Sequence, residues 1–86
     1  MKFQGALVKE QGVTFAIVAV KPHVIDNRSE ARRTILFFQP AFSGVPIILM
    51  AQDVGGRARY CGRRDIIQFL ATVPLGAIPW KEYRVG

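Results

Sequence analysis

The stretch Val-Thr-Phe-Ala-Ile-Val-Ala-Val, residues 13–20, decides how this chain folds. Its β-branched and aromatic residues favour a strand, and its apolar side chains occupy both of the alternating positions. A strand that is apolar on both faces is typical of the middle of a sheet, where both faces are covered. We therefore predict a central, doubly covered strand over residues 13–21, which ends because Pro22 cannot donate to a sheet ladder.

Four further segments predict strands, and turn residues join them. Gly12 suits the turn of a hairpin between the first two strands, and the pair Gly55-Gly56 suits a second hairpin. Pro79 indicates that the last strand starts late or lies at a sheet edge. The five expected strands cover residues 3–9, 13–21, 45–52, 57–61 and 77–85.

A helix is expected between the two hairpins. Asn27 and Glu30 have the spacing of a capping box, and the apolar residues that follow recur on one helical face. Residues 31–38 are also open to a strand, because the second half of this segment is continuously apolar. The capping residues favour the helix, and Pro40 should end it near Phe38.

A second helix follows the second hairpin and completes the fold prediction. Apolar residues from Ile66 to Val73 have i, i+3, i+4, i+7 spacing, and Asp65 is a suitable cap or first-turn acid. The order β-β-α-β-β-α-β predicts an α+β fold in one small domain, residues 1–86, with a mainly antiparallel five-stranded sheet and two helices. A small, strongly bent five-stranded β-barrel is the alternative.

Length and composition exclude several classes of protein. With 86 residues, 50% of them hydrophobic, the chain is too apolar to be disordered and too small for a two-domain enzyme. A single cysteine, Cys61, excludes a disulfide scaffold. A domain of this size has little interior, so a mean hydropathy of +0.20 predicts exposed apolar surface and self-association.

The sequence favours a cytoplasmic location. No apolar run approaches the roughly 20 residues that span a bilayer. Gln4 and Lys9 interrupt the segment in which an export signal would lie. We therefore expect no membrane association and a reducing compartment.

Positive charge is concentrated around one turn. The chain carries a charge of +6, and residues 57–64 contain four arginines and no acid. Arginine forks bind phosphate or carboxylate bidentately, and a following helix N-terminus presents unpaired N–H groups. We predict an anion-binding or nucleic-acid-binding site here; the alternative is that the glycines only close a hairpin and Asp65 only caps a helix and pairs with an arginine. The expected site residues are Arg57, Arg59, Tyr60, Gly62, Arg63 and Arg64.

Aromatic residues beside basic ones extend this hypothesis to single-stranded nucleic acid. Tyr60, Trp80 and Tyr83 each adjoin or closely follow a lysine or arginine, an arrangement suited to stacking bases. The alternative is that Trp80 and Tyr83 hold the last strand on the core. The signatures of the common RNA-binding modules and of a helix-turn-helix are absent from the sequence.

Apolar residues in two places predict a homodimer. Leu36, Phe37 and Phe38 cannot share one helical face, because successive side chains lie about 100° apart, so some must face a second layer or a second subunit. The terminal strand is suited to pairing with the edge of another chain. The expected interface residues are Phe37, Phe42, Trp80 and Tyr83.

Cys61 and His23 are the residues that would have to support catalysis. Neighbouring arginines and a helix N-terminus lower a thiol pKa, but a lone cysteine is usually a small packed hydrophobe. One histidine, one cysteine and six scattered acids are too few for a metal site or a catalytic triad. We therefore expect no metal, no cofactor and no catalytic residue, and a cysteine-dependent enzyme is the least favoured function.

Two functions are better supported by the sequence. The first is a small, dimeric cytoplasmic binding module whose arginine-rich hairpin and helix start bind an anionic partner, either nucleic acid or an acidic protein. The alternative is a homo-oligomeric protein-interaction module with no nucleic-acid role, in which the apolar excess matters more than the charge.

Overall fold

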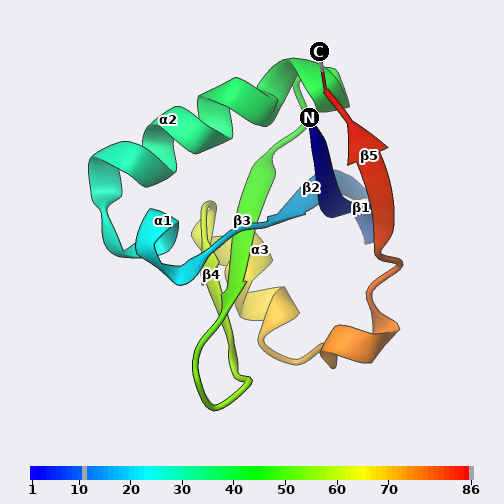
Figure 1. Cartoon of the computed structure of the whole chain (residues 1–86). Coiled ribbons are helices and arrows are strands. Elements are labelled where there is room, and N and C mark those ends of the chain that lie inside the picture. Colours follow the sequence, from blue (N-terminus) through cyan, green and yellow to red (C-terminus); the bar gives the residue numbers. More distant parts are fainter. Residues whose placement is uncertain (11, 86) are drawn as a thin grey trace.

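A computed structural model describes residues 1–10 and 12–85 of the chain (Figure 1). The expected order of strands and two main helices is confirmed, and a short extra helix, α1, lies between β2 and α2. The strands are β1 (Lys2–Glu10), β2 (Val13–Ala19), β3 (Ile47–Gln52), β4 (Ala58–Cys61) and β5 (Lys81–Arg84). The helices are α1 (Pro22–Asp26), α2 (Arg28–Phe38) and α3 (Arg64–Leu70), with 3-10 turns η1 (Gln39–Phe42) and η2 (Leu75–Ala77).

The five strands form one mixed sheet in the order β4-β3-β2-β1-β5. The pair β2–β3 is parallel, because α1 and α2 carry the chain from the end of β2 back to the start of β3, and the other neighbours are antiparallel. The prediction of a mainly antiparallel five-stranded sheet in an α+β fold is therefore confirmed.

The alternative of a small β-barrel is wrong. A barrel closes by pairing its first and last strands around an interior on one face of the sheet. Here β4 and β5 stand at opposite ends of the sheet, and helices cover both of its faces. Each face already has its own core, so closure would bury nothing further.

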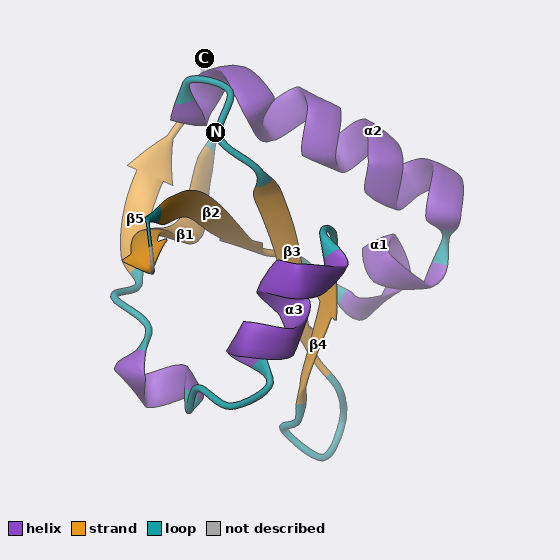
Figure 2. Cartoon of the chain, turned by 180° about the vertical axis from the view of Figure 1, so that it is seen from behind, coloured by secondary structure: helices purple, strands orange, loops and turns teal. Residues whose placement is uncertain are grey.

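The predicted central strand is confirmed, and it separates two hydrophobic cores. Ala16 and Val18 of β2 point into the first core, beneath α1 and α2. Phe15 and Ile17 point into the second core, which α3 covers on the other face (Figure 2). Ala16, Ile17 and Val18 are all 0% exposed, as expected for a strand covered on both sides.

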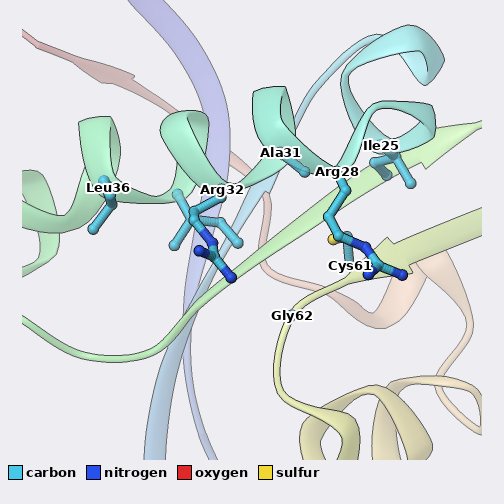
Figure 3. Close-up of a pocket in the computed structure, with 8 residues that line it drawn as sticks. Ile25, Arg28, Ala31, Arg32, Leu36, Cys61 and Gly62 are labelled. Atoms are coloured by element: carbon cyan, nitrogen blue, oxygen red, sulfur yellow. The ribbon is translucent and has the colours of Figure 1, made fainter.

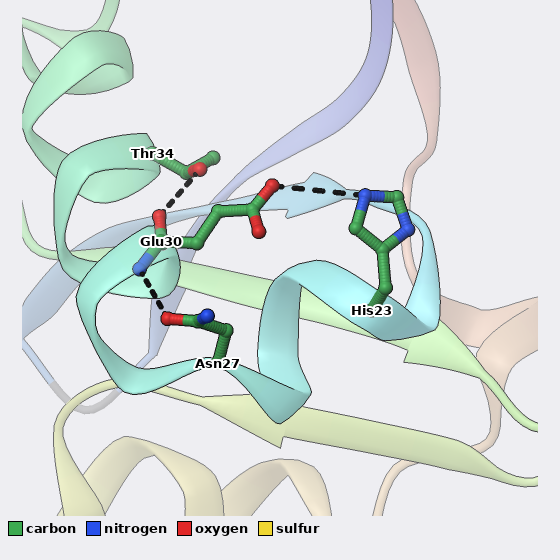
Figure 4. A network of polar contacts seen from close by, with 4 residues as sticks. All are labelled: His23, Asn27, Glu30 and Thr34. Carbon is green, nitrogen blue, oxygen red and sulfur yellow. Dashed lines mark hydrogen bonds and ion pairs between the residues drawn. The ribbon is translucent and has the colours of Figure 1, made fainter.

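Residues 31–38 are helical, which resolves the ambiguity that the sequence left. The Asn27 side chain accepts a hydrogen bond of 3.0 Å from the Glu30 N–H, which is one half of the expected capping box, whereas the Glu30 carboxylate faces His23 (Figure 4). Ala31 and Phe38 are buried against the sheet. The α-helix ends at Phe38, where the chain tightens into η1, with Pro40 in its first turn.

The predictions for Pro79 and Asp65 are confirmed in β5 and α3. β5 begins only after Pro79 and forms one end of the sheet. Asp65 lies in the first turn of α3, whereas the residue that precedes the helix is Arg63. α3 ends at Leu70, three residues before the apolar periodicity ends at Val73.

Candidate functional site

The hairpin between β3 and β4 holds the arginine-rich segment in place. The Asp53 carboxylate accepts hydrogen bonds from the backbone N–H groups of Gly55, at 2.9 Å, and Arg57, at 3.0 Å. Gly56 has a φ of +81°, a conformation that costs glycine little. These contacts fix the turn, and the chain then returns beside β3 as β4, with its side chains alternating between the two faces of the sheet.

Two of the four predicted site arginines are paired with acids of the same chain. Arg59 donates to Asp26 of α1 at 2.5 Å, and Arg63 binds Asp65 bidentately at 2.9 and 2.6 Å. The hydrogen bond from Arg63 lowers the pKa of Asp65 to about 2, and the hydrogen bond from Arg59 lowers the pKa of Asp26. The charges of these two arginines are therefore already compensated by carboxylates. The alternative interpretation, in which Asp65 pairs with an arginine, is confirmed in this respect.

Other arginines have no such compensation. Arg57 and Arg64 form no ion pair with any of the described residues. The same is true of Arg28, Arg32 and Arg33 on the exposed surface of α2. The arginines of α2 were not among the predicted site residues, although the spacing of Arg28 and Arg32 by four residues indicates a shared helical face.

Gly62 has a structural reason to be glycine. Its φ is +149°, and a Cβ at this position would lie 2.6 Å from Cδ1 of Ile48 and 3.0 Å from the carbonyl oxygen of Ile47. The glycine therefore allows the chain to leave β4 in close contact with β3. Gly62 is one of the predicted site residues, and packing against β3 is by itself a sufficient reason for a glycine at this position.

A groove lies between α2 and the end of β4, and we call it the α2 groove (Figure 3). Its volume is about 350 Å³. Arg28 and Arg32 extend from α2 over this groove, on the side of Cys61 and Gly62. Its apolar lining comes from Ile25, Ala31, Ile35, Leu36 and Cys61.

A second groove borders β4 on the opposite face of the sheet, and we call it the α3 groove. Its volume is about 620 Å³, and Arg57 stands beside it. Ala58 and Tyr60 of β4 pack with the core beneath α3, whereas Cys61 packs with the core beneath α2. β4 is thus bordered by a largely apolar groove on each face. The main lining of the α3 groove is Ala58, Tyr60, Ile67, Leu70, Val73 and Leu75.

The three aromatic residues expected to stack on bases pack against the hydrophobic cores instead. The Tyr60 hydroxyl is buried without a hydrogen-bond partner among the described residues, and burial raises the pKa of this phenol. The Trp80 indole N–H donates to the Leu75 carbonyl at 3.2 Å. The Tyr83 ring stacks on Phe3 at 5.5 Å between ring centroids. All three rings thus contact the hydrophobic cores, as the structural alternative for Trp80 and Tyr83 proposed.

The residues expected at a dimer interface differ in exposure. Phe42 is 6% exposed and belongs to the core beneath α2. Phe37 is 53% exposed, and its neighbour Leu36 is 63% exposed, so both present apolar surface to solvent on α2. Trp80 and Tyr83 are half-buried, as described above.

Cys61 and His23 have separate surroundings. The Cys61 thiol is half-buried and packs against the core beneath α2. His23 of α1 instead faces Glu30, with 3.6 Å between Nε2 and the carboxylate (Figure 4). Within residues 1–10 and 12–85, no three His, Cys, Asp or Glu side chains come together as a set of metal ligands.

Comparisons with protein-family models, with curated proteins and with solved structures find no match to this chain. In the part of the chain that the structure describes, every helix is too short or too polar to cross a bilayer.

Proposed function

We propose that this chain is a noncatalytic binding module whose ligand is a protein with an acidic and partly apolar surface. The binding surface consists of the exposed side of α2 and the two grooves beside β4. Its cationic residues are Arg28, Arg32 and Arg57, and its exposed apolar residues are Leu36 and Phe37.

One observation carries the proposal. Leu36 and Phe37 are more than half exposed, on the same helix as three arginines that have no ion pair among the described residues. Exposed apolar side chains gain free energy when a partner covers them, and arginine is enriched in such interfaces. A partner that carries both apolar and acidic groups satisfies both features of this surface.

The same surface suits nucleic acid less well. Binding of single strands combines cations with aromatic faces on which bases stack. Tyr60, Trp80 and Tyr83 pack against the cores, and Arg59 and Arg63 are paired with carboxylates. We therefore prefer an acidic protein as the ligand, and a nucleic-acid ligand is an outcome that the test can return.

A binding assay with defined probes tests the proposal. The first probe is a fluorescein-labelled peptide of eight residues in which glutamate and valine alternate, and the second is single-stranded oligo-dT of similar length. We expect the peptide to bind more tightly than the oligonucleotide and its affinity to fall as salt is raised from 50 to 200 mM, because the contacts are partly ionic. Tighter binding of the oligonucleotide, or no binding of the peptide, would overturn the proposal.

A matched pair of charge reversals locates the surface. Arg32→Glu changes a side chain at the α2 groove, whereas Arg84→Glu makes the same change in net charge on β5. We expect Arg32→Glu to weaken peptide binding about tenfold more than Arg84→Glu, because only the former places a like charge beside the ligand. Equal effects would mean that net charge alone attracts the peptide.

A homodimer is a second proposal, and exposed Phe37 is the observation that favours it. A dimer that covers Leu36 and Phe37 of both copies would bury apolar surface that otherwise faces water. Sedimentation equilibrium should then show a concentration-dependent dimer that Phe37→Ser weakens. A monomer at millimolar concentration would exclude this dimer.

We also infer that the module works in the cytoplasm. The half-buried free thiol of Cys61 is compatible with a reducing compartment. Fractionation of the source cells tests the location, and recovery with a membrane or secreted fraction would contradict it.

A further inference from the structure

We propose that the open edge of β4 accepts an extended acidic segment of the partner protein as a sixth strand of the sheet. This inference rests on the proposed function and specifies how the partner binds. Its ligand is a peptide stretch of alternating acidic and apolar residues, held by backbone hydrogen bonds to β4 and by side chains in the α2 and α3 grooves.

The backbone of β4 has unused hydrogen-bonding groups along its outer side. The Asp53 N–H donates to the Arg57 carbonyl at 2.9 Å, and bonded pairs recur at every second residue of an antiparallel ladder. Arg59 and Cys61 therefore bond to Ala51 and Leu49, their partners in β3. The N–H and C=O groups of Ala58 and Tyr60 point away from β3, toward a side where no other described strand lies.

The pairing of β3 with β2 supports this assignment independently. The Val20 N–H donates to the Met50 carbonyl at 2.8 Å, and the Ala16 N–H donates to the Pro46 carbonyl at 2.9 Å. Even-numbered residues of β3 thus face β2, which leaves Leu49 and Ala51 to face β4. The outer groups of Ala58 and Tyr60 are those that an added strand would meet.

The grooves are placed to receive the side chains of an added strand. Successive side chains of a strand point to opposite faces of the sheet. The α2 groove borders β4 on one face at Cys61 and Gly62, and the α3 groove borders it on the other face at Ala58 and Tyr60. Backbone pairing with alternate side chains in pockets is the general mode of peptide recognition by strand addition.

The charge at this edge selects the composition of the segment. Arg28 and Arg32 stand over the α2 groove, and Arg57 stands beside the α3 groove. None of these three guanidinium groups forms an ion pair within the described ranges. A partner segment whose acidic side chains face the α2 groove and whose apolar side chains face the α3 groove would therefore complement the charge and the apolar lining on the two sides of β4.

The same charge argues against a second copy of this chain as the added strand. Two β4 edges paired antiparallel would bring Arg57 and its neighbouring arginines from both copies to one seam. Three acids lie near this edge: Asp26 and Asp65 are engaged by Arg59 and Arg63, and Asp53 accepts hydrogen bonds from the backbone of its own turn. Like charges placed opposite one another destabilise a strand pair, so an acidic partner is favoured.

The test compares the alternating Glu/Val peptide with a version N-methylated at two residues of its pairing edge. N-methylation removes the backbone donors but keeps the charge and the side chains. We expect the methylated peptide to bind about tenfold or more weakly, because two hydrogen bonds are lost. A peptide of the same composition with its glutamates and valines in two blocks should also bind more weakly, because alternate positions no longer match the two grooves.

Amide hydrogen exchange gives a readout at the strand itself. In the free protein the N–H groups of Ala58 and Tyr60 should exchange rapidly, and the unmethylated peptide should slow the exchange of both. The amides of Arg59 and Cys61, which bond to β3, serve as internal controls and should be slow in both states.

A proline variant at each edge of the sheet completes the experiment. Ala58→Pro removes an outward N–H of β4 without removing a bond to β3. Glu82→Pro makes the same change at an exposed position of β5. Peptide affinity should fall with Ala58→Pro and not with Glu82→Pro.

The two proposals fail in different ways. Peptide that binds equally with and without N-methylation, and leaves the exchange of Ala58 and Tyr60 unchanged, would overturn strand addition while leaving the acidic-protein function intact. Peptide that does not bind at all would overturn both. The peptide and exchange measurements do not depend on whether Ala58→Pro folds.

Discussion

The two ends of the sheet, β4 and β5, have the same length and differ in what surrounds them. β5 pairs with β1, and Tyr83 anchors it by stacking on Phe3. The other β5 side chains, Lys81, Glu82 and Arg84, are exposed and charged, which is a common protection of an edge against unwanted pairing. β4 instead presents half-buried residues between two grooves. An edge strand can therefore pair with a further strand more readily when grooves beside it can also bury the added side chains.

Among the variants that test this difference between β4 and β5, Gly62→Ala should change the stability of the fold most. The added Cβ would meet the Ile47 carbonyl and the Ile48 side chain, and the φ of +149° is unfavourable for alanine. We expect the free energy of unfolding to fall by about 2–4 kcal/mol, because the end of β4 must move away from β3. Urea denaturation measures this change.

Two other glycines provide the controls for Gly62→Ala. Gly5 of β1 lies under Tyr83, and its added Cβ would be 3.0 Å from the Ile17 carbonyl and 3.3 Å from the Tyr83 ring. Gly5→Ala should therefore also destabilise, but less, because Gly5 lacks the positive φ of Gly62 and the 2.6 Å contact that a Cβ at Gly62 would make with Ile48. Gly76 has nothing within 4 Å of an added Cβ, so Gly76→Ala should be close to neutral. A neutral Gly62→Ala would show that β4 does not need its close contact with β3.

Tyr60→Phe should change the free energy of unfolding less than Gly62→Ala does, and it should raise it. The Tyr60 hydroxyl is buried without a partner among the described residues, so the fold bears its desolvation with no hydrogen bond in return. We expect removal of this hydroxyl to raise the free energy of unfolding by about 1 kcal/mol in urea denaturation. Tyr83→Phe at the other edge is the control and should change stability less. A loss of stability in Tyr60→Phe would reveal a partner for the hydroxyl.

The ion pair between Arg63 and Asp65 should contribute least to the stability of the fold, because both groups are exposed. The pKa of Asp65 in the folded chain is about 2, below its ordinary value of 3.8. A lowered pKa means that the pair stabilises the fold above about pH 4 and that this contribution is lost as the pH falls toward 2. NMR titration of the Asp65 carboxyl checks the value.

Arg63→Gln should return the pKa of Asp65 toward 3.8, since the hydrogen bond from Arg63 is the main cause of the lowering. The corresponding change, Arg59→Gln, should raise the pKa of Asp26 and leave that of Asp65 unchanged. An Asp65 pKa that stays near 2 without Arg63 would assign the lowering to the backbone of α3 instead.

Much of the fold could be predicted because its signals are local. The doubly apolar strand at residues 13–20 lies at the centre of the sheet, and the Asn27 cap forms with Glu30 three residues away. Cys61 and Tyr60 of β4 face opposite sides of the sheet, as successive residues of any strand do. Each of these features depends on periodicity or on neighbours within one turn, which a single sequence displays.

The candidate site was harder to predict because its partners are distant in the chain. Arg59 is paired with Asp26, which lies 33 positions earlier, and this pairing depends on where α1 packs. The contribution of Arg28 and Arg32 depends on the passage of α2 across the sheet, which brings them over the end of β4. No local pattern relates the arginines of α2 to those of residues 57–64, so a single sequence points only to the cluster at residues 57–64.

Apolar periodicity and capping are properties of neighbouring residues, so the amino-acid sequence was enough to predict the five strands, the central position of β2 and the Asn27 cap of α2. Only the three-dimensional packing shows that β2 and β3 run parallel, that β4 is the edge opposite β5, and that grooves flank β4 on both faces. These features arise from packing between elements far apart in the chain, where burial of apolar surface in two separate cores selects one arrangement.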